Sequence, residues 1–292
     1  MSKIAVIGPG AMGCLFAARF VRAGHKTCLV DYRPQRADAL AKSGITVDAL
    51  HGSFSERVPV ATQIPQGTEL ALVLTKAHST PSLRLPGDVP VLTLQNGLGN
   101  VETLCGMVGS ARVIAGVSTE AVTLVEPGRV RHAAAGTSVF GAWTSCPTDL
   151  ACAVFRDAGL DFVLTDTPGQ VIWEKAAINA GINPLTALLD VPNGRLVEMS
   201  DVRQLLRDLV LEATKVAATE GYRFQHSLAE AAEDLCRQTR DNISSMLQDV
   251  RNRKKTEIRA ISGEILRRAQ AASLPVPRTR VVYQLVRGLE GR

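Results

Sequence analysis

The feature that most constrains the fold of this chain lies within its first 24 residues. Residues 3–7 (KIAVI) form a short apolar run of the kind that is buried in a parallel sheet. The segment GPGAMG follows at residues 8–13, and a helical pattern runs from residue 11 to residue 23 and ends at Gly24. A GxGxxG segment between a predicted strand and a predicted helix indicates an α/β fold with a Rossmann-type dinucleotide-binding domain.

Each glycine of this segment has its own physical role in such a fold. Gly8 permits the tight turn, Gly10 lets the backbone approach a pyrophosphate, and Gly13 lets the helix pack closely on the strand. The N-terminus of the helix adds N–H groups without helical partners and a partial positive charge. We therefore expect the whole segment to bind the cofactor: Gly8, Pro9, Gly10, Ala11, Met12 and Gly13.

The composition of the chain is that of a globular protein with a substantial core. Hydrophobic residues make up 46% of the 292 residues and charged residues 21%, with a formal net charge of +5. Basic residues gather at 251–255 (RNRKK) and 267–268. Such clusters can bind phosphate, but they are more typical of a solvated helix face. Because no aromatic-rich basic motif accompanies them, we expect no nucleic-acid partner.

The cysteines and the apolar runs narrow the class of protein further. The six cysteines are scattered, without a CxxC motif or a pair of histidines at ligand spacing, so we expect neither a metal site nor a disulfide framework. The predicted strand at residues 3–7 leaves no room for a signal peptide. No apolar run approaches the 18 or so residues of a membrane span. These observations predict a cytoplasmic protein that makes no membrane contact.

The second predicted strand, residues 27–30, bears on the identity of the dinucleotide. It ends at Asp31, where this type of fold places an acid against the ribose hydroxyls, which favours NAD(H). Arg33 and Arg36 stand beside it and could instead hold the 2′-phosphate of NADP(H). Asp31 could also be only a turn residue ahead of Pro34.

Two further predicted strands end in polar residues. The strand at residues 70–74 is followed by Thr75 and Lys76, and the strand at 91–94 is followed by Gln95, Asn96 and a glycine. The carboxyl ends of parallel strands meet at one edge of the sheet, where the cofactor lies. We expect Lys76 to meet a phosphate and Asn96 to reach the nicotinamide or the substrate, although Asn-Gly is also an ordinary turn dipeptide.

The character of the sequence changes near residue 167. Before it we predict a strand at 112–117, antiparallel strands within 120–141 that complete the sheet, a helix at 149–158 and a strand at 161–164. After the segment Thr-Pro-Gly at 167–169, helical patterns prevail. We therefore predict two domains: a Rossmann-type dinucleotide-binding domain at 1–167 and an all-α substrate-binding domain at 168–292.

The first helix of the second half carries an unusual row of polar residues. Lys175, Asn179 and Asn183 are spaced four apart in the run WEKAAINAGINPLTA, so they share one helix face. Burying an ammonium group without a partner costs several kcal/mol, on the order of the stability of a domain. The row is therefore a candidate site, or else a solvated face on which Lys175 extends to water. Pro184 predicts that the helix ends or kinks there.

The remaining helical segments hold a second group of candidates. We predict long helices at 201–220 and 225–240, a turn at Asn193-Gly194, and a short segment after Pro277. In the run NISSMLQD, residues 242, 245 and 249 share one helical face. Glu257 follows Ser245 by 12 residues, about 120° away on an unbroken helix. The two side chains reach one site only if the helix bends or the site is broad.

These motifs together carry a resemblance that spans the whole chain. The segments GPGAMG, Lys-Ala after the strand at 70–74, Gln-Asn-Gly, WEKAAINAGINPLTA, NISSMLQD and TEI resemble ketopantoate reductase (2-dehydropantoate 2-reductase) in order and spacing. The resemblance implies that a Rossmann domain binds NADPH and that an all-α domain holds the keto acid.

The same resemblance implies roles for individual residues. It makes Lys175 the general acid, with Glu257 beside it as the second catalytic residue. It places Asn96 and Glu257 between the substrate and the cofactor. The residues implied to contact the substrate are Asn96, Asn179, Asn183, Asn193 and Ser245, and those implied on the cofactor side are Lys76, Asn96, Ala121 and Glu257. Asp31 and Arg33 are added to the cofactor side by their place after the second strand.

Two departures from the family pattern concern specificity. The family usually has arginine directly after the second strand, where this chain has Asp31 and Tyr32. NAD(H) therefore stays open beside NADP(H). After TEI the family commonly continues Asp-Tyr-Ile-Asn-Gly, whereas this chain continues Arg-Ala-Ile-Ser-Gly from Arg259. The local charge is reversed, so a keto acid other than ketopantoate stays open too.

The predicted activity is the NAD(P)H-dependent reduction of ketopantoate to pantoate, a step of pantothenate and coenzyme A biosynthesis. A ketone that receives hydride becomes an alkoxide, which needs a proton donor such as Lys175. One alternative is the reduction or oxidation of another small 2-keto or 3-hydroxy acid. Another is a dinucleotide-sensing protein without catalysis, although a sensor needs no proton donor. The sequence leaves a homodimer open.

Overall fold

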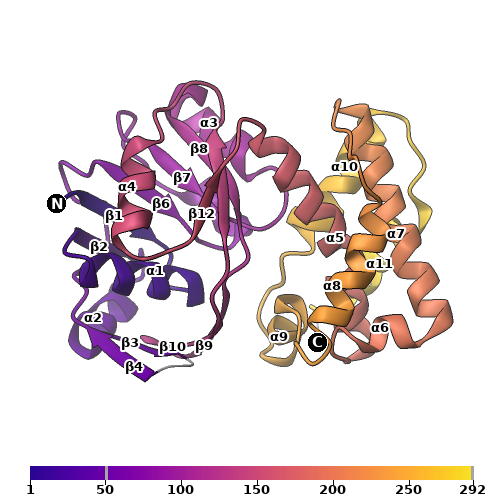
Figure 1. Cartoon of the computed structure of the whole chain (residues 1–292), viewed down its shortest axis with the longest axis horizontal. Coiled ribbons are helices and arrows are strands. Elements are labelled where there is room, and N and C mark those ends of the chain that lie inside the picture. The colour runs from indigo at the N-terminus through magenta and orange to yellow at the C-terminus, as the bar shows by residue number, and fades with distance from the viewer. Residues whose placement is uncertain (50–51, 291–292) are drawn as a thin grey trace. The chain divides into compact units, whose positions relative to one another are not determined.

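The computed structural model describes residues 1–49 and 52–290, which form two compact units (Figure 1). The first unit comprises Met1–Gln95 and Asn100–Gly169. The second comprises Gln170–Arg292 together with the short segment Asn96–Gly99, which follows a strand of the first unit along the chain. The division into independently folding domains 1–167 and 168–292 stays a prediction.

The first unit contains an eight-stranded sheet with the order β12-β11-β8-β7-β6-β1-β2-β5. Six of its strands were predicted from the sequence within one residue at each end. Neighbouring strands from β8 to β5 are parallel, β11 runs antiparallel to β8, and β12 is parallel to β11. The strands are β1 (Lys3–Ile7), β2 (Lys26–Val30), β5 (Val60–Ala61), β6 (Leu70–Val73), β7 (Val91–Thr93), β8 (Val113–Ser118), β11 (Ser138–Ala142) and β12 (Phe162–Leu164).

The core of this unit follows from the apolar runs of the central strands. All four residues of β6 are buried, as are the last four of β1. Helix α1 (Ala11–Arg22) buries Phe16 and Phe20, and their rings lie 5.5 and 5.8 Å from Phe155 of α4 (Asp149–Asp157). Each fully buried side chain of this size stabilises the fold by roughly 1.5–3 kcal/mol. The aromatic cluster thus holds α1, and with it the glycine segment, in place.

A second sheet corrects one expectation from the sequence. The segment 120–141 was expected to complete the first sheet, but only β11 does so. Strands β9 (Ala121–Glu126) and β10 (Arg129–Ala134) join β3 (Ile45–Ala49) and β4 (Gly52–Glu56) in a four-stranded sheet, with the order β4-β3-β10-β9. Helix α1 contacts all four strands. The physical reason is that α1 has apolar side chains to cover on the face that points away from the first sheet.

Two further helices and two short 3₁₀ turns complete the first unit. They are α2 (Pro34–Ser43), α3 (Asn100–Val108), η1 (Ala77–Ser82) and η2 (Ser110–Arg112). Together with the parallel sheet they confirm the Rossmann-type α/β fold that the glycine segment predicted.

The second unit is all-α over its described residues, as predicted, and no described strand follows Leu164. The last helix, expected as a short segment, is 13 residues long. No helix of the described residues has a long enough apolar stretch to cross a membrane. The helices are α5 (Pro168–Leu189), α6 (Arg195–Glu198), α7 (Ser200–Thr219), α8 (Leu228–Gln238), α9 (Ser245–Arg251), the π-helix η3 (Arg259–Gly263), α10 (Glu264–Ala271) and α11 (Pro277–Leu289).

Helix α5 does not end at Pro184, contrary to one of the two outcomes expected from the sequence. It continues to Leu189. The hydroxyl of Thr186 donates to the carbonyl oxygens of Ile182 at 3.1 Å and Asn183 at 2.9 Å. Bonds of this kind, from Thr to carbonyls of the preceding turn, often accompany a bend in a helix. Helix α5 thus contains Pro184 at an interior position.

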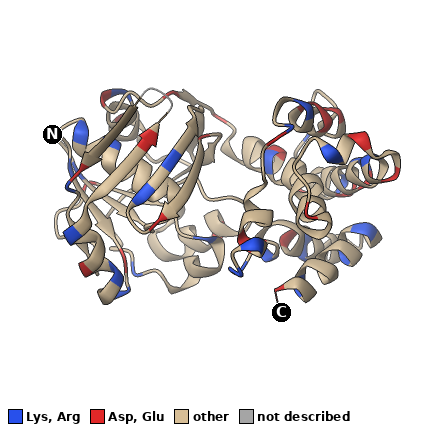
Figure 2. Cartoon of the chain, turned by 90° about the horizontal axis from the view of Figure 1, so that it is seen from below, with Lys and Arg blue, Asp and Glu red and all other residues tan. Residues whose placement is uncertain are grey.

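The basic clusters are not simple helix faces. Helix α9 ends at Arg251, which pairs with Asp190 at 2.7 Å, and residues 252–255 lie beyond the helix end. Arg268 is mostly buried, because it pairs with Glu220 at 2.7 Å and lies over the ring of Trp173. The expectation of a solvated face is therefore wrong for Arg268. Figure 2 shows basic and acidic positions interspersed along the helices.

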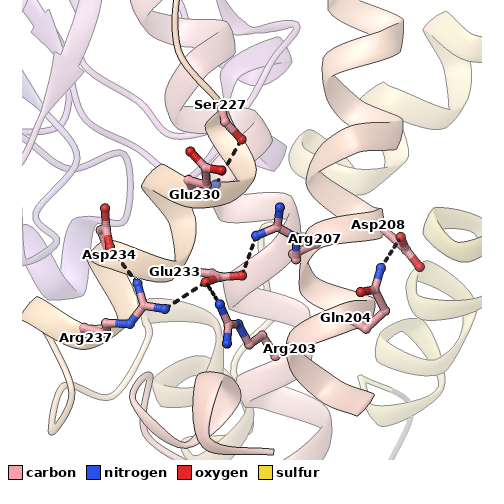
Figure 3. Close-up of polar contacts among 9 residues, drawn as sticks. All are labelled: Arg203, Gln204, Arg207, Asp208, Ser227, Glu230, Glu233, Asp234 and Arg237. Carbon is pink, nitrogen blue, oxygen red and sulfur yellow. Dashed lines mark hydrogen bonds and ion pairs between the residues drawn. The ribbon is translucent and has the colours of Figure 1, made fainter. Parts of the chain in front are cut away.

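Helices α7 and α8 are joined by a charged cluster around one buried carboxylate (Figure 3). Glu233 is 2% exposed and accepts hydrogen bonds from Arg203 at 2.6 Å, Arg207 at 2.7 Å and Arg237 at 2.8 Å. These guanidinium groups, Arg203 foremost, lower the pKa of Glu233 to about 2, although burial acts in the opposite sense. Three cations from two helices thus converge on a single side chain, and this holds the helices together.

We predict that Glu233→Gln destabilises the protein in a pH-dependent way. A carboxyl whose pKa is lowered on folding stabilises the fold above its ordinary pKa and loses this effect as the pH falls toward 2. The variant should lose roughly 2–3 kcal/mol of unfolding free energy at pH 7. Urea unfolding of both proteins between pH 7 and pH 3 should show the difference shrinking with pH.

The matched control is Asp234→Asn, because Asp234 also pairs with Arg237 but is exposed. We expect a change below about 0.5 kcal/mol for this control. A pH-independent loss in Glu233→Gln would contradict the assignment of its effect to charge.

Candidate functional site

The glycine segment has the geometry that a bound dinucleotide requires. Gly8 has φ +109°, and a Cβ atom there would lie 2.8 Å from the backbone nitrogen of Thr75. A Cβ at Gly13 would lie 1.9 Å from the carbonyl oxygen of Gly8. At Gly10, by contrast, a Cβ would meet nothing within 4 Å. The first and third glycines are fixed by close packing, while the second leaves space in front of the N-terminus of α1, where a pyrophosphate fits.

Pro9, Ala11 and Met12 complete this segment and are all partly exposed. Gly10 is the N-cap of α1 and has no side chain, so the first N–H groups of the helix receive no side-chain cap. All six predicted residues of the segment therefore lie at one helix N-terminus.

Gln95 organises the carboxyl edge of the sheet, a role that the sequence did not reveal. Its amide nitrogen donates to the carbonyl oxygen of Thr75 at 2.7 Å and to the hydroxyl of Thr80 at 2.9 Å. Its amide oxygen accepts from Thr93 at 3.0 Å. These bonds join the ends of β6 and β7 and fix the start of η1, where Lys76 is the partly exposed N-cap residue.

Asp31 is not exposed at the end of β2. The residue is 2% exposed, and the guanidinium group of Arg36 binds both carboxylate oxygens through Nε and Nη2. The backbone N–H of Arg33 donates to the same carboxylate at 3.1 Å. The charge of Asp31 is therefore balanced within the protein, and Arg33, the N-cap residue of α2, remains exposed.

Ala121 is the first residue of β9 and follows Glu120, whose carboxylate is buried and hydrogen-bonded. The carboxylate of Glu120 lies 2.6 Å from Nε2 of His132 on β10 and accepts from the backbone N–H of Gly136 at 3.1 Å. The sequence reasoning missed this pair. The available signal was an acid directly before the predicted residue, but its partners lie 12 and 16 residues away, beyond any local pattern.

In the helical unit, Lys175 and Glu257 are brought together. Burial lowers the pKa of Lys175 from 10.5 to about 8, while the charge of Glu257 acts in the opposite sense. An ammonium group with this pKa is largely protonated at pH 7 and releases its proton readily. The two predicted catalytic residues thus interact, although they are 82 positions apart.

Asn96 joins the same group through the segment Asn96–Gly99. Its side-chain amide donates to Glu257 at 3.3 Å. The N–H of Leu98 donates to the carbonyl oxygen of Ala260 at 2.8 Å, and Gly97 has φ +83°. A Cβ at Gly97 would lie 2.6 Å from that carbonyl oxygen, so the segment packs against the π-helix η3 as closely as glycine allows. Short π-helical turns are frequently found at functional sites.

Glu257 itself is held by its neighbours in the sequence. Thr256 is buried and donates to Oε1 of Glu290 from both its backbone N–H, at 2.8 Å, and its hydroxyl, at 2.6 Å. Ile258 is also buried. Because α9 ends at Arg251, Glu257 does not share a helix with Ser245, and the expected angle between them on an unbroken helix does not apply.

Asn179 and Asn183 lie on α5 one and two turns after Lys175. Asn183 is 7% exposed, and Asn179 is partly exposed. Within the described residues, neither side-chain amide forms a hydrogen bond. Buried amides are normally bonded in a folded protein. This row can therefore offer donors and acceptors to a ligand.

Asn193 and Ser245 are less closely joined to this group. The amide nitrogen of Asn193 donates to Thr239 at 2.9 Å, and its buried oxygen has no partner among the described residues. Ser245 is the exposed first residue of α9, whereas its neighbour Ser244 caps the helix and bonds to Thr186 at 2.7 Å. Residue 242 precedes α9, so the face expected across residues 242–249 begins only at Ser245.

The described residues show no metal-binding cluster. Across 1–49 and 52–290, no three His, Cys, Asp or Glu side chains gather in a way that could hold an ion. All six cysteines lie within these ranges and are free thiols.

Comparisons with known proteins identify the family. The family model described as ketopantoate reductase PanE/ApbA matches residues 4–145, and its C-terminal counterpart matches residues 169–290. The 2-dehydropantoate 2-reductase of Halobacterium salinarum is 33% identical over 98% of this chain and 98% of its own length.

Solved structures show the same fold. The PanE/ApbA family ketopantoate reductase from Ralstonia eutropha JMP134 superposes with a TM-score of 0.91 at 33% identity, over 99% of this chain and 98% of that chain. D-mandelate dehydrogenase with NADH and anilino(oxo)acetate superposes with a TM-score of 0.90, over 99% and 98% of the two chains. Its identity is 24%, so this likeness concerns the fold alone.

The fold, its glycine segment and these matches define the class of protein, an oxidoreductase that uses a nicotinamide dinucleotide. Within that class, the chain belongs to the ketopantoate reductase family.

We predict that Gly97→Ala strains the segment that carries Asn96. Alanine at a positive φ is unfavourable, and here its Cβ would also clash with the carbonyl oxygen of Ala260. The variant should lose roughly 2–4 kcal/mol of unfolding free energy. Gly221→Ala is the matched control, because Gly221 has φ +90° but open space around the Cβ position. Urea unfolding should show a clearly smaller loss for the control, and equal losses would show that close packing at Gly97 is unimportant.

Proposed function

We propose that the protein reduces ketopantoate to pantoate with NADPH, with Lys175 as the proton donor. One observation carries the proposal: a lysine whose pKa is lowered to about 8 interacts with Glu257, which in turn bonds to Asn96. The names of the relatives add the substrate, since the protein from Halobacterium salinarum is a 2-dehydropantoate 2-reductase.

Lys175 is suited to protonate an alkoxide as it forms. Its ammonium group is charged at neutral pH, so it can stabilise the developing negative charge before it gives up the proton. The lowered pKa brings the donor closer to the pH at which the enzyme works, and this eases the transfer. We propose that Glu257 keeps enough negative charge nearby to hold Lys175 protonated between turnovers.

The amides beside Lys175 are suited to hold the substrate. Asn179 and Asn183 form no side-chain hydrogen bonds within the described chain, so they can bond to a hydroxyl and a carbonyl without adding charge. We propose that Ser245, exposed at the N-terminus of α9, binds the carboxylate, and that Asn193 contacts the substrate as well. Binding of the hydroxyl and the carbonyl by neutral groups adds no charge that would compete with the ammonium of Lys175 at the reacting oxygen.

The first unit holds the cofactor in this proposal. A bound nicotinamide supplies hydride to the ketone carbon. The glycine segment and Lys76 bind the phosphates, and Ala121 contacts the nicotinamide end. The preference for NADPH over NADH is supported by the family. The charge of Asp31 does not oppose it, because Arg36 already balances that charge.

Another short 2-keto acid is the second candidate substrate. The favouring observation is Arg259, exposed at the start of η3 two residues after Glu257, where the family commonly has an acid. The structural likeness to D-mandelate dehydrogenase adds that this fold also serves a different 2-hydroxy acid.

Turnover of ketopantoate against a panel of 2-keto acids, each with NADPH and NADH, tests the proposal. We expect the highest kcat/KM for ketopantoate, and we expect Asn183→Ala to raise the KM for the keto acid far more than the KM for the cofactor. A higher kcat/KM for another keto acid would show that this acid, and not ketopantoate, is the substrate. A change confined to the KM for the cofactor would contradict the assignment of Asn183 to the substrate.

Removal of the ammonium group should abolish most of the activity. We predict that Lys175→Ala lowers kcat by about 10²–10⁴-fold, the range for loss of a general acid. Lys215→Ala, which removes an exposed lysine of α7, is the matched control and should retain full activity. We expect Glu257→Gln to be milder than Lys175→Ala, because the amide preserves hydrogen bonding and only the charge is lost.

The pH profile offers a second readout of Lys175. Because the protonated form donates, the wild-type rate of ketone reduction should fall as the pH rises through about 8, where Lys175 loses its proton. This limb should be absent from the residual activity of Lys175→Ala. Near wild-type turnover in that variant, or an unchanged alkaline limb, would remove Lys175 from the mechanism.

A further inference from the structure

A hollow of about 670 Å³ lies in the first unit, next to the end of β2. Its lining includes Tyr32, two residues after β2, and residues 62–64, directly after β5. These two strands are parallel neighbours, with Val30 opposite Ala61. The hollow therefore opens at the carboxyl edge of the sheet, the edge that also carries Gly8 and Thr75. We refer to it as the Tyr32 hollow.

The lining of the Tyr32 hollow combines flat apolar surfaces with neutral polar groups. Ile64, Leu85 and the phenol ring of Tyr32 provide the apolar part, and Thr62 and Gln63 provide hydroxyl and amide groups. An adenine ring needs both, because its faces stack on apolar or aromatic surfaces while its edges form hydrogen bonds.

The only cation that lines this hollow, among the described residues, is Arg84. Arg84 is exposed and forms no ion pair within residues 1–49 and 52–290. Arg36 is in a different state, because its Nε and Nη2 are bonded to Asp31. Arg33 is exposed as well, but it does not line the hollow. A phosphate near the mouth of the hollow would therefore find its counter-charge at Arg84.

Tyr32 and Arg84 are also in contact with each other. The phenol of Tyr32 donates to the carbonyl oxygen of Arg84 at 3.5 Å. Burial raises the pKa of this phenol, while the backbone hydrogen bond and the guanidinium charge of Arg84 act in the opposite sense. The guanidinium group of Arg84 is thus close enough to affect the pKa of Tyr32, which lines the hollow.

The Tyr32 hollow lies where this fold places the adenosine end of a dinucleotide, and we propose that Arg84 recognises a phosphate on the 2′-oxygen of that ribose. This assignment deepens the proposed function and rests on it. It gives the chain a second route to NADPH, since the position directly after β2 that usually carries arginine in the family is occupied by the acid Asp31.

Titration with two nucleotides tests the assignment without any turnover. Adenosine 2′,5′-bisphosphate and adenosine 5′-monophosphate differ only in the 2′-phosphate, and calorimetry gives the affinity of each. We expect Arg84→Gln to weaken the bisphosphate by about 10-fold or more, the usual effect of losing a charged hydrogen-bonding partner, and to leave the monophosphate nearly unchanged. Tyr32→Ala should weaken both nucleotides. Arg57→Gln, which removes an exposed arginine that does not line the hollow, is the matched control and should change neither affinity by more than about twofold.

The outcomes separate this inference from the proposed function. Unchanged bisphosphate affinity in Arg84→Gln, or an equal loss in the control Arg57→Gln, would overturn the role of Arg84, and an equal loss in Arg33→Gln would assign the phosphate to Arg33 instead. Equal affinity of the wild type for both nucleotides would also overturn the role of Arg84, and failure of Tyr32→Ala to weaken either would overturn the adenosine assignment. If the nucleotides behave as expected but no keto acid is reduced, the hollow is confirmed and the proposed function fails.

Discussion

The free-energy cost of removing the Lys175 ammonium from water is the constraint on which the helical unit depends. Burial lowers the pKa of this lysine, and the nearby negative charge of Glu257 limits the effect. That charge, Glu257, lies outside a regular helix, so its position has to be fixed by other groups. The double hydrogen bond from Thr256 to Glu290 fixes it on one side, and the segment carrying Asn96 packs against it on the other. The counter-charge of Lys175 is thus held in position by hydrogen bonds on both sides.

The parts of the fold that depend on local pattern could be predicted from the sequence. Buried strands such as Lys3–Ile7 and the long helix starting at Ser200 have strong periodicity of their own. The second sheet could not be predicted, because it forms by pairing β3 with β10, more than 80 residues later, and because β4 is largely polar. The continuation of α5 past Pro184 to Leu189 could not be predicted either, because an interior proline removes a helix hydrogen bond and normally indicates a helix end or a kink.

The candidate site shows the same division. The spacing of Lys175, Asn179 and Asn183 sufficed to place them on one helix face, since a helix has a fixed period. The partners that orient the site come from distant positions and lack such a period. Asp31 is the clearest case, because the sequence shows its place at the strand end but not that its carboxylate is already bonded. Charge balance inside a protein therefore has to be read from the structure.

The short segment Asn96–Gly99 has a consequence for dissecting the chain. It belongs by its contacts to the helical unit, although the strand before it and the helix after it belong to the sheet unit. A fragment that begins at Gln170 would contain Lys175 and Glu257 but would lose Asn96 and the cover over Ala260. Such a fragment would be incomplete at the place of the proposed chemistry. A chain that combined this sheet unit with another helical unit would keep these contacts only if its segment at 96–99 matched the new helices.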